Sequence, residues 1–124
     1  MKRVFCFAVC CLLLFSSCGK VSQDETHNIV FTDSLGERIV LSSRPQKTAV
    51  LFSSFAELWQ EAGGTVAVTV GETVERGIVS SEVPLVDTGA GKTVDTELLL
   101  TLQPDFVLCS ADIPAQVATA AFLR

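Results

Sequence analysis

Few side chains in this 124-residue chain are of the types that bind metals or act as nucleophiles. The sequence has one histidine, five cysteines and no tyrosine. His27 lies in a polar stretch, where a histidine is expected to be solvated, and Cys109 lies in a run typical of a buried strand, which predicts a core thiol. Glu72 and Glu75 are too few to enclose a hard cation. The sequence therefore predicts no metal site, no bound cofactor and no catalytic centre.

Gly91-Lys92-Thr93 comes nearest to a nucleotide-binding motif. A phosphate-binding loop of the form G-x-x-x-x-G-K-[ST] would need a glycine where Val86 stands. No G-x-G-x-x-G follows the apolar run at 48–52 either. A nucleotide-dependent enzyme is therefore a disfavoured alternative, and we expect that the protein is not an enzyme.

The N-terminus has the parts of an export signal. The first three residues form a basic start, residues 4–15 form an uninterrupted apolar run, and Ser16 and Ser17 precede Cys18. This run is too short for a membrane-spanning helix, which needs about 20 residues. We expect residues 1–17 to be removed as a signal peptide.

The exit from the apolar run resembles the signal of bacterial lipoproteins, in which the cysteine becomes the lipidated first residue. The resemblance implies that Cys18 is lipidated and that the exported protein is anchored to the cell membrane, facing the periplasm or the cell exterior. The polar residues 18–28 are expected to form a flexible tether. The alternative is ordinary secretion with cleavage near Ser17, which leaves Cys18 as a free thiol.

The charge balance excludes one class of partner. The chain has 9 basic and 14 acidic side chains, which gives a formal net charge of -5. Residues 1–17 contain two of the basic side chains and none of the acidic ones, so removing them makes the remainder more acidic. A nucleic-acid-binding surface needs a basic face, so nucleic acid is not an expected partner.

From residue 29 onward the chain alternates between strand and helix patterns. Two β-rich runs, 29–32 and 38–41, flank turn-forming residues and predict a hairpin. Continuous apolar runs predict buried strands at 48–52, 66–70 and 105–109. Helices are expected between and after these strands. Their predicted start signals are Ser53 or Ser54, Asp95, and Asp112 with Pro114, and residues 71–84 are expected to form an irregular loop.

Each expected helix has apolar positions that predict its buried face. In the first they include Leu58 and Trp59, in the second Leu98, Leu99, Leu100 and Leu102, and in the third Ile113, Val117 and Ala121. The alternation predicts an α/β fold: a single Rossmann-like lobe with an N-terminal hairpin and a mostly parallel sheet that carries helices on both faces. The last helix reaches Arg124 without a stop signal, so we expect an N-terminal fragment of a larger protein.

Three pieces of sequence, in this order, carry a resemblance to a known family: Phe31–Gly36, residues 49–63 and residues 95–108. With them, residues 29–124 resemble the N-terminal lobe of the periplasmic substrate-binding proteins of ABC importers for iron-siderophore complexes, haem or vitamin B12. The resemblance implies half of a two-lobe fold, in which an iron chelate or a corrinoid is captured in the inter-lobe cleft and delivered to the permease and its ATPase. The alternative is a truncated, nonfunctional remnant of such a protein.

Residues in the loops after the strands are the candidate ligand contacts, because open α/β sheets bind ligands beyond the carboxyl ends of their strands. Lys92 is a cation that could meet an anionic siderophore or a haem propionate. Helix capping and turn formation are the alternative roles for these positions. The candidates are Ser53, Ser54, Phe55, Glu72, Thr88, Gly89, Lys92, Ser110 and Asp112.

Glu97 has a separate expected role. It matches the exposed glutamate that, in the family, lies at a helix start and pairs with arginines of the permease, so the resemblance implies permease docking. A carboxylate in the first turn of a helix is also stabilised by the helix dipole, which is the alternative explanation for its position.

Overall fold

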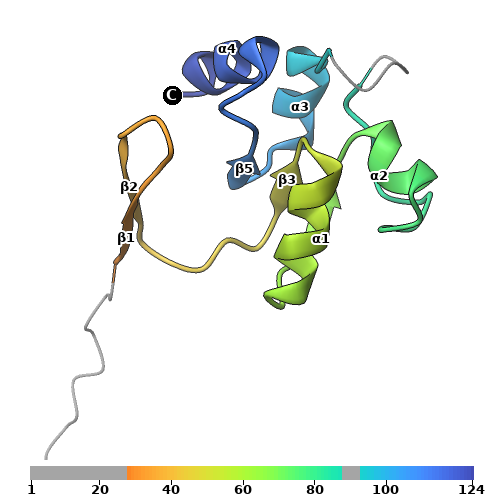
Figure 1. The fold of residues 1–124 in the computed structure, drawn as a ribbon, viewed down its shortest axis with the longest axis horizontal. Coiled ribbons are helices and arrows are strands. Elements are labelled where there is room, and N and C mark those ends of the chain that lie inside the picture. Colours follow the sequence, from red (N-terminus) through yellow and green to blue (C-terminus); the bar gives the residue numbers. More distant parts are fainter. Residues whose placement is uncertain (1–27, 88–92) are drawn as a thin grey trace, which may run out of the picture.

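The computed structural model describes residues 28–87 and 93–124 (Figure 1). The described part begins with a two-stranded antiparallel sheet of β1 (Ile29–Thr32) and β2 (Arg38–Leu41). Both strands have the bounds that the sequence predicts, so the hairpin prediction is confirmed.

Local turn chemistry accounts for this hairpin. Asp33 Oδ1 accepts hydrogen bonds from the backbone N–H groups of Leu35 at 2.9 Å and Glu37 at 2.8 Å. Gly36 has a φ of +85°, a left-handed conformation that favours glycine. The turn is therefore encoded mainly by residues 33–36 and their neighbours. One contact comes from a distant part of the chain, because Arg124 Nη2 donates to Asp33 Oδ2 at 3.2 Å.

The central sheet has three parallel strands in the order β4-β3-β5. They are β3 (Thr48–Val50), β4 (Val66–Val68) and β5 (Phe106–Leu108). Every residue of β3 is buried, as expected for a strand covered on both faces. The strands are shorter than predicted, partly because the extended residues Phe52 and Val70 already serve as N-caps of the following helices.

Four helices are present in the described ranges: α1 (Ser53–Glu61), α2 (Gly71–Glu75), α3 (Thr96–Leu102) and α4 (Pro114–Phe122). In these parts of the chain, no helix has the length and apolar character needed to cross a membrane. The prediction of a wholly irregular loop after β4 is wrong, because α2 forms directly after Val70. Only the residues beyond α2 follow an irregular path to Leu85.

The helix starts confirm one predicted cap and correct the others. Asp95 caps α3 as expected, because its Oδ1 accepts a hydrogen bond from Leu98 N at 2.9 Å. Neither predicted serine caps α1: its N-cap is Phe52, which has no side-chain hydrogen bond to the helix. In α4, Pro114 lies in the first turn as predicted, but the N-cap is Ile113 and not Asp112.

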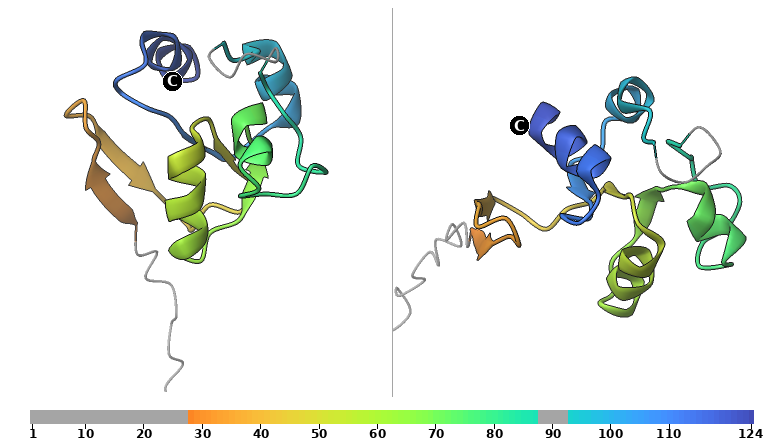
Figure 2. Two further views of the ribbon diagram at one scale, coloured as in Figure 1. Left: turned by 45° about the vertical axis from the view of Figure 1, so that its right-hand side comes forward. Right: turned by 45° about the horizontal axis from the view of Figure 1, so that its top comes forward.

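The sheet separates two hydrophobic clusters. On one face, core residues such as Leu51, Val68 and Leu99 pack with Leu102 of α3 and Leu123 after α4. On the other face, Val50, Val66 and Ala56 of α1 pack with Trp59 and Leu108. Figure 2 (right) shows α3 and α4 on one side of the strands and α1 on the other. The predicted α/β fold, a parallel sheet with helices on both faces, is therefore confirmed.

The buried faces of the helices differ in part from the prediction. Leu99 is buried, but Leu98 is 39% exposed and Leu100 is 48% exposed, because successive helical residues point about 100° apart and cannot all face one sheet. Leu58 is also 60% exposed. The buried residues of α4 are polar: Gln116 and Thr119. Hydrogen bonds to Ser110 N and Leu51 O explain why Gln116 is buried, whereas Thr119 donates within the helix to Ala115 O, and Ala121 is exposed.

Candidate functional site

The edge of the sheet beyond the carboxyl ends of β3 and β4 brings a serine, a carboxylate and a guanidinium together. Ser53, the first residue of α1, is only 1% exposed. Its hydroxyl donates a hydrogen bond to Glu72 Oε1 on α2 at 2.9 Å and accepts one from Arg76 Nη1 at 2.8 Å. We refer to Ser53, Glu72, Arg76 and Glu57 as the Ser53 cluster.

Arg76 is the cation of this cluster and is partly exposed. Its Nη2 lies 3.7 Å from Glu57 Oε2, and its Nη1 lies 4.0 Å from Glu72 Oε1 and 3.5 Å from Ser54 Oγ. Exposed ion pairs of this kind contribute about 0–1 kcal/mol each to stability. Their main effect here is to hold the guanidinium, with its five N–H donors, at the edge where the strands end.

A buried glutamine joins the carboxyl ends of β3 and β5. Gln116 of α4 is 1% exposed, and its Nε2 donates to the backbone oxygen of Leu51 at 2.7 Å. Its Oε1 accepts from Ser110 N, also at 2.7 Å, and Ser110 Oγ accepts from Asp112 N at 3.2 Å. This one side chain therefore fixes where the loops after β3 and β5 begin.

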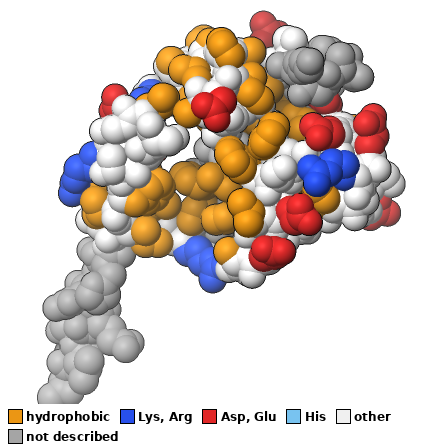
Figure 3. All heavy atoms as spheres, in the orientation of Figure 1, with side chains coloured by type: hydrophobic (Ala, Val, Ile, Leu, Met, Phe, Trp, Pro, Cys, Tyr) orange, Lys and Arg blue, Asp and Glu red, His pale blue; other side chains and the backbone are white. Residues whose placement is uncertain are grey.

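Among the residues that the structure describes, carboxylates outnumber cations at this edge of the sheet. Asp87 Oδ2 accepts a hydrogen bond from Gly71 N at 2.9 Å, where a Cβ atom on Gly71 would lie only 3.3 Å from that oxygen. Asp112 is exposed after β5. Of the carboxylates at this edge, Glu57 and Glu72 are the ones that lie within 4.0 Å of the Arg76 guanidinium. Acidic side chains are also prominent near α2 in Figure 3.

The structure places six of the nine predicted ligand residues in the loops or helix starts at this edge: Ser53, Ser54, Phe55, Glu72, Ser110 and Asp112. The Ser53 hydroxyl and the Ser110 N–H are already engaged in internal hydrogen bonds. Phe55 packs edge-on against Phe52, with ring centroids 5.2 Å apart. Thr88, Gly89 and Lys92 lie outside the described residues, as does Cys18.

Two residues that organise this edge, Arg76 and Gln116, are absent from the sequence-based prediction. The spacing of Glu72 and Arg76, four residues apart, is typical of a pair on one helical turn, but the prediction of an irregular loop at 71–84 excludes such a pair. Gln116 binds Leu51, which is 65 residues away in the sequence. No local sequence signal identifies such a partner.

Glu97 is exposed in the first turn of α3, so the predicted location of this carboxylate is confirmed. Its backbone oxygen accepts a hydrogen bond from Thr101 Oγ1 at 2.9 Å. The Thr101 hydroxyl therefore binds the backbone of Glu97 and not its carboxylate. Its role in docking stays a prediction.

Metal ligands do not gather in the part of the chain that the structure describes. There, no group of three or more His, Cys, Asp or Glu residues is arranged to hold a metal ion. Cys109 is half-buried, and burial raises the pKa of its thiol, so the thiolate is disfavoured. The prediction of a core thiol is correct only in part, because this side chain also lines a cavity.

Comparisons with known proteins define a class of fold. No family model matches the sequence, and none of the curated proteins matches it either. Among solved structures, the chain is similar to the siderophore-binding protein BauB, which was determined bound to a complex between two molecules of acinetobactin and ferric iron. The TM-score is 0.62 at 21% sequence identity, and the match covers 77% of this chain and 33% of that chain. This chain therefore has the fold of part of a binding protein and spans about a third of its length.

Proposed function

We propose that this chain forms the N-terminal lobe of an exported substrate-binding protein that delivers an iron complex, such as a siderophore or haem, or a corrinoid to an ABC importer. The observation that carries the proposal is the similarity of its fold to the siderophore-binding protein. The polar edge beyond the parallel strands supports it, because open sheets of this type bind ligands there.

In this proposal the ligand lies against the exposed parts of the Ser53 cluster. The guanidinium of Arg76 offers N–H donors to carboxylate, catecholate or hydroxamate oxygens of a chelate. The iron is cargo held by its chelator, and the protein recognises the complex as a whole. A single lobe supplies one wall of a cleft, so its own affinity is expected to be weak.

Nuclear magnetic resonance titration of the 15N-labelled chain tests this function. The probes are the gallium complex of a hydroxamate siderophore, haemin and cyanocobalamin. At least one should shift the amide signals of Ser54, Glu72 and Arg76 at high ligand concentration. Arg76→Gln should weaken that response, whereas Arg44→Gln should not, because Arg44 donates to Gly63 O outside this edge.

Two outcomes would contradict the proposal. If no probe shifts these signals, the lobe does not bind this class of ligand, and the alternative of a nonfunctional remnant gains support. If a probe binds the single lobe with submicromolar affinity, the proposed need for a second wall is wrong.

The same proposal includes a lipid anchor at Cys18 and a permease-docking role for Glu97. The lipoprotein-like signal supports lipidation of Cys18 and anchoring at the membrane surface. The exposed position of Glu97 supports docking to the permease.

A further inference from the structure

The Ser53 cluster carries an excess of negative charge. Its guanidinium, on Arg76, lies 3.7 Å from Glu57 Oε2 and 4.0 Å from Glu72 Oε1. Two carboxylates therefore face one cation, and one negative charge of the cluster is left uncompensated. The side chains of Glu57 and Glu72 are 55% and 47% exposed, so this charge is open to a ligand.

Two further carboxylates at the same edge add to this charge. Asp87 binds a neutral partner, because its Oδ2 accepts a hydrogen bond from the Gly71 N–H group at 2.9 Å. Asp112 is exposed in the loop after β5. Lys92 lies outside the described residues, and including its charge still leaves four carboxylates against two cations.

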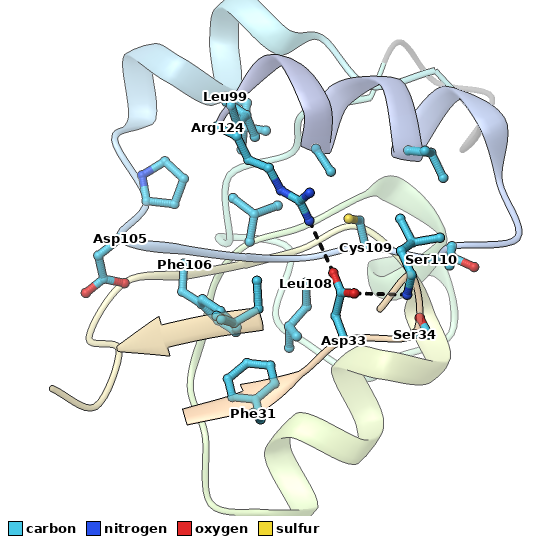
Figure 4. Close-up of a pocket in the computed structure, with 18 of the residues that line it drawn as sticks. Phe31, Asp33, Ser34, Leu99, Asp105, Phe106, Leu108, Cys109, Ser110 and Arg124 are labelled. Carbon is cyan, nitrogen blue, oxygen red and sulfur yellow. Dashed lines mark hydrogen bonds and ion pairs between the residues drawn. The ribbon is translucent and has the colours of Figure 1, made fainter. Parts of the chain in front are cut away.

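The other cations of the described chain are placed or engaged elsewhere. Arg44 and Lys47 precede β3, at its amino end, and Arg38 lies in β2. Arg124 pairs with Asp33 at 3.2 Å beside a cavity of about 620 Å³ between the hairpin and β5 (Figure 4). These cations therefore do not compensate the negative charge of the Ser53 cluster.

The charge of this edge bears on the kind of chelate that it favours. A tris-catecholate complex of ferric iron is strongly anionic, and like charges brought together at an interface cost affinity. A complex with a protonated amine would instead place a cation beside Glu57 and Glu72. Its hydroxamate oxygens would remain free to accept hydrogen bonds from Arg76.

We propose that the ligand of this edge is an iron complex of net positive charge: a neutral ferric hydroxamate core that carries a protonated amine, which pairs with Glu57. The inference rests on the proposed function, because it takes the Ser53 cluster to be the ligand contact. It gives Glu57 a role of its own, since this exposed carboxylate then determines which chelates are preferred.

Three probes that share one metal core and differ in the charge of one end test this inference. They are the gallium complex of a linear trihydroxamate with a terminal amine, the same complex with the amine acetylated, and the same complex with the amine succinylated. At neutral pH they carry one positive charge, no net charge and one negative charge. Nuclear magnetic resonance titration of the full 15N-labelled chain gives a dissociation constant for each from the amide signals of Ser54 and Arg76.

The dissociation constant should rise about threefold at each step from the positive to the neutral to the negative probe, as expected for unit charges about 6 Å apart in water. Added salt should reduce these ratios. Glu57→Gln should lower the ratio between the negative and the positive probe by about threefold or more. Glu61→Gln, which removes the same charge at the far end of α1, is the matched control and should leave the ratio nearly unchanged.

Equal affinity for the three probes, or tightest binding of the negative one, would overturn the inference and leave the proposed function in place, because a chelate still binds. Equal changes of the ratio in Glu57→Gln and Glu61→Gln would also overturn it. If none of the three shifts the signals but haemin or cyanocobalamin does, the inference alone fails. If no probe of either set shifts them, the proposed function fails as well.

Discussion

At the carboxyl-end edge, one neutral hydroxyl serves two charged groups, because Ser53 donates to Glu72 and accepts from Arg76. Ser53→Ala should lower the free energy of unfolding by about 1 kcal/mol, since both charged partners remain able to bind water. Ser54→Ala is the matched control and should change it little, because its hydroxyl lies 3.5 Å from the same guanidinium. Urea denaturation followed by Trp59 fluorescence measures both variants. Equal losses would show that the Ser53 bridge contributes nothing of its own.

Asp105 supplies a pH-dependent contact before β5. Its carboxylate accepts hydrogen bonds from Gln46 N at 2.7 Å and Lys47 N at 2.8 Å, and the bond from Gln46 is the main cause that lowers its pKa below the usual range. A lowered pKa in the folded state means that the charged form stabilises the fold. That contribution is complete above the ordinary pKa of the carboxyl group and is lost as the pH falls through the folded-state value.

Asp105→Asn should therefore lower the thermal midpoint at neutral pH. The difference from the natural chain should shrink as the solution is acidified, because the natural carboxylate becomes protonated and the two proteins then resemble each other. Thermal denaturation at a series of pH values measures this difference. If it is the same at neutral and strongly acidic pH, the lowered pKa of Asp105 does not contribute to stability.

At the scale of elements, the predictions succeeded where a signal is local. The hairpin and the Asp95 cap depend on contacts within four residues, and both form as predicted. Helix α2 was missed because its five residues, starting with Gly71, are too short for an apolar period to show. Since Arg76 depends on that helix for its position, the cation of the Ser53 cluster was missed with it.

Gln116 shows why a helix face cannot always be assigned from apolar positions. A polar side chain is buried in α4 because two backbone groups at the strand ends need partners. Gln116→Leu should leave Ser110 N and Leu51 O unpaired, at a cost of about 2 kcal/mol or more in the free energy of unfolding. Gln60→Leu, on the exposed side of α1, is the control. Urea denaturation measures the free energy of unfolding of both variants. If Gln116→Leu lowers it no more than Gln60→Leu does, the two hydrogen bonds of Gln116 do not stabilise the fold.

At the scale of the whole molecule, the proposed function requires surfaces that meet other components. The family resemblance implies that Glu97 faces arginines of the permease, and the structure leaves this residue exposed in the first turn of α3. Glu97→Arg should then oppose like charges, which costs several kcal/mol at an interface. In cells that import the ligand through this protein, uptake should fall while ligand affinity is unchanged. Glu61→Arg, which changes another exposed carboxylate, is the control, and equal uptake by both variants would exclude docking through Glu97.

The membrane is the other component that the proposed function requires, and Cys18 is proposed to anchor the lobe to it. The polar residues that separate Cys18 from β1 would let an anchored lobe stand clear of the lipid headgroups. Because each buried methylene contributes about 0.8 kcal/mol, more than one acyl chain is needed for stable anchoring. Mass spectrometry of the membrane-extracted protein should therefore find acyl mass on Cys18 as the first residue. Cys18→Ser should release the protein from the membrane fraction, and a natural chain recovered in soluble form with a free Cys18 thiol would show that it is secreted without an anchor.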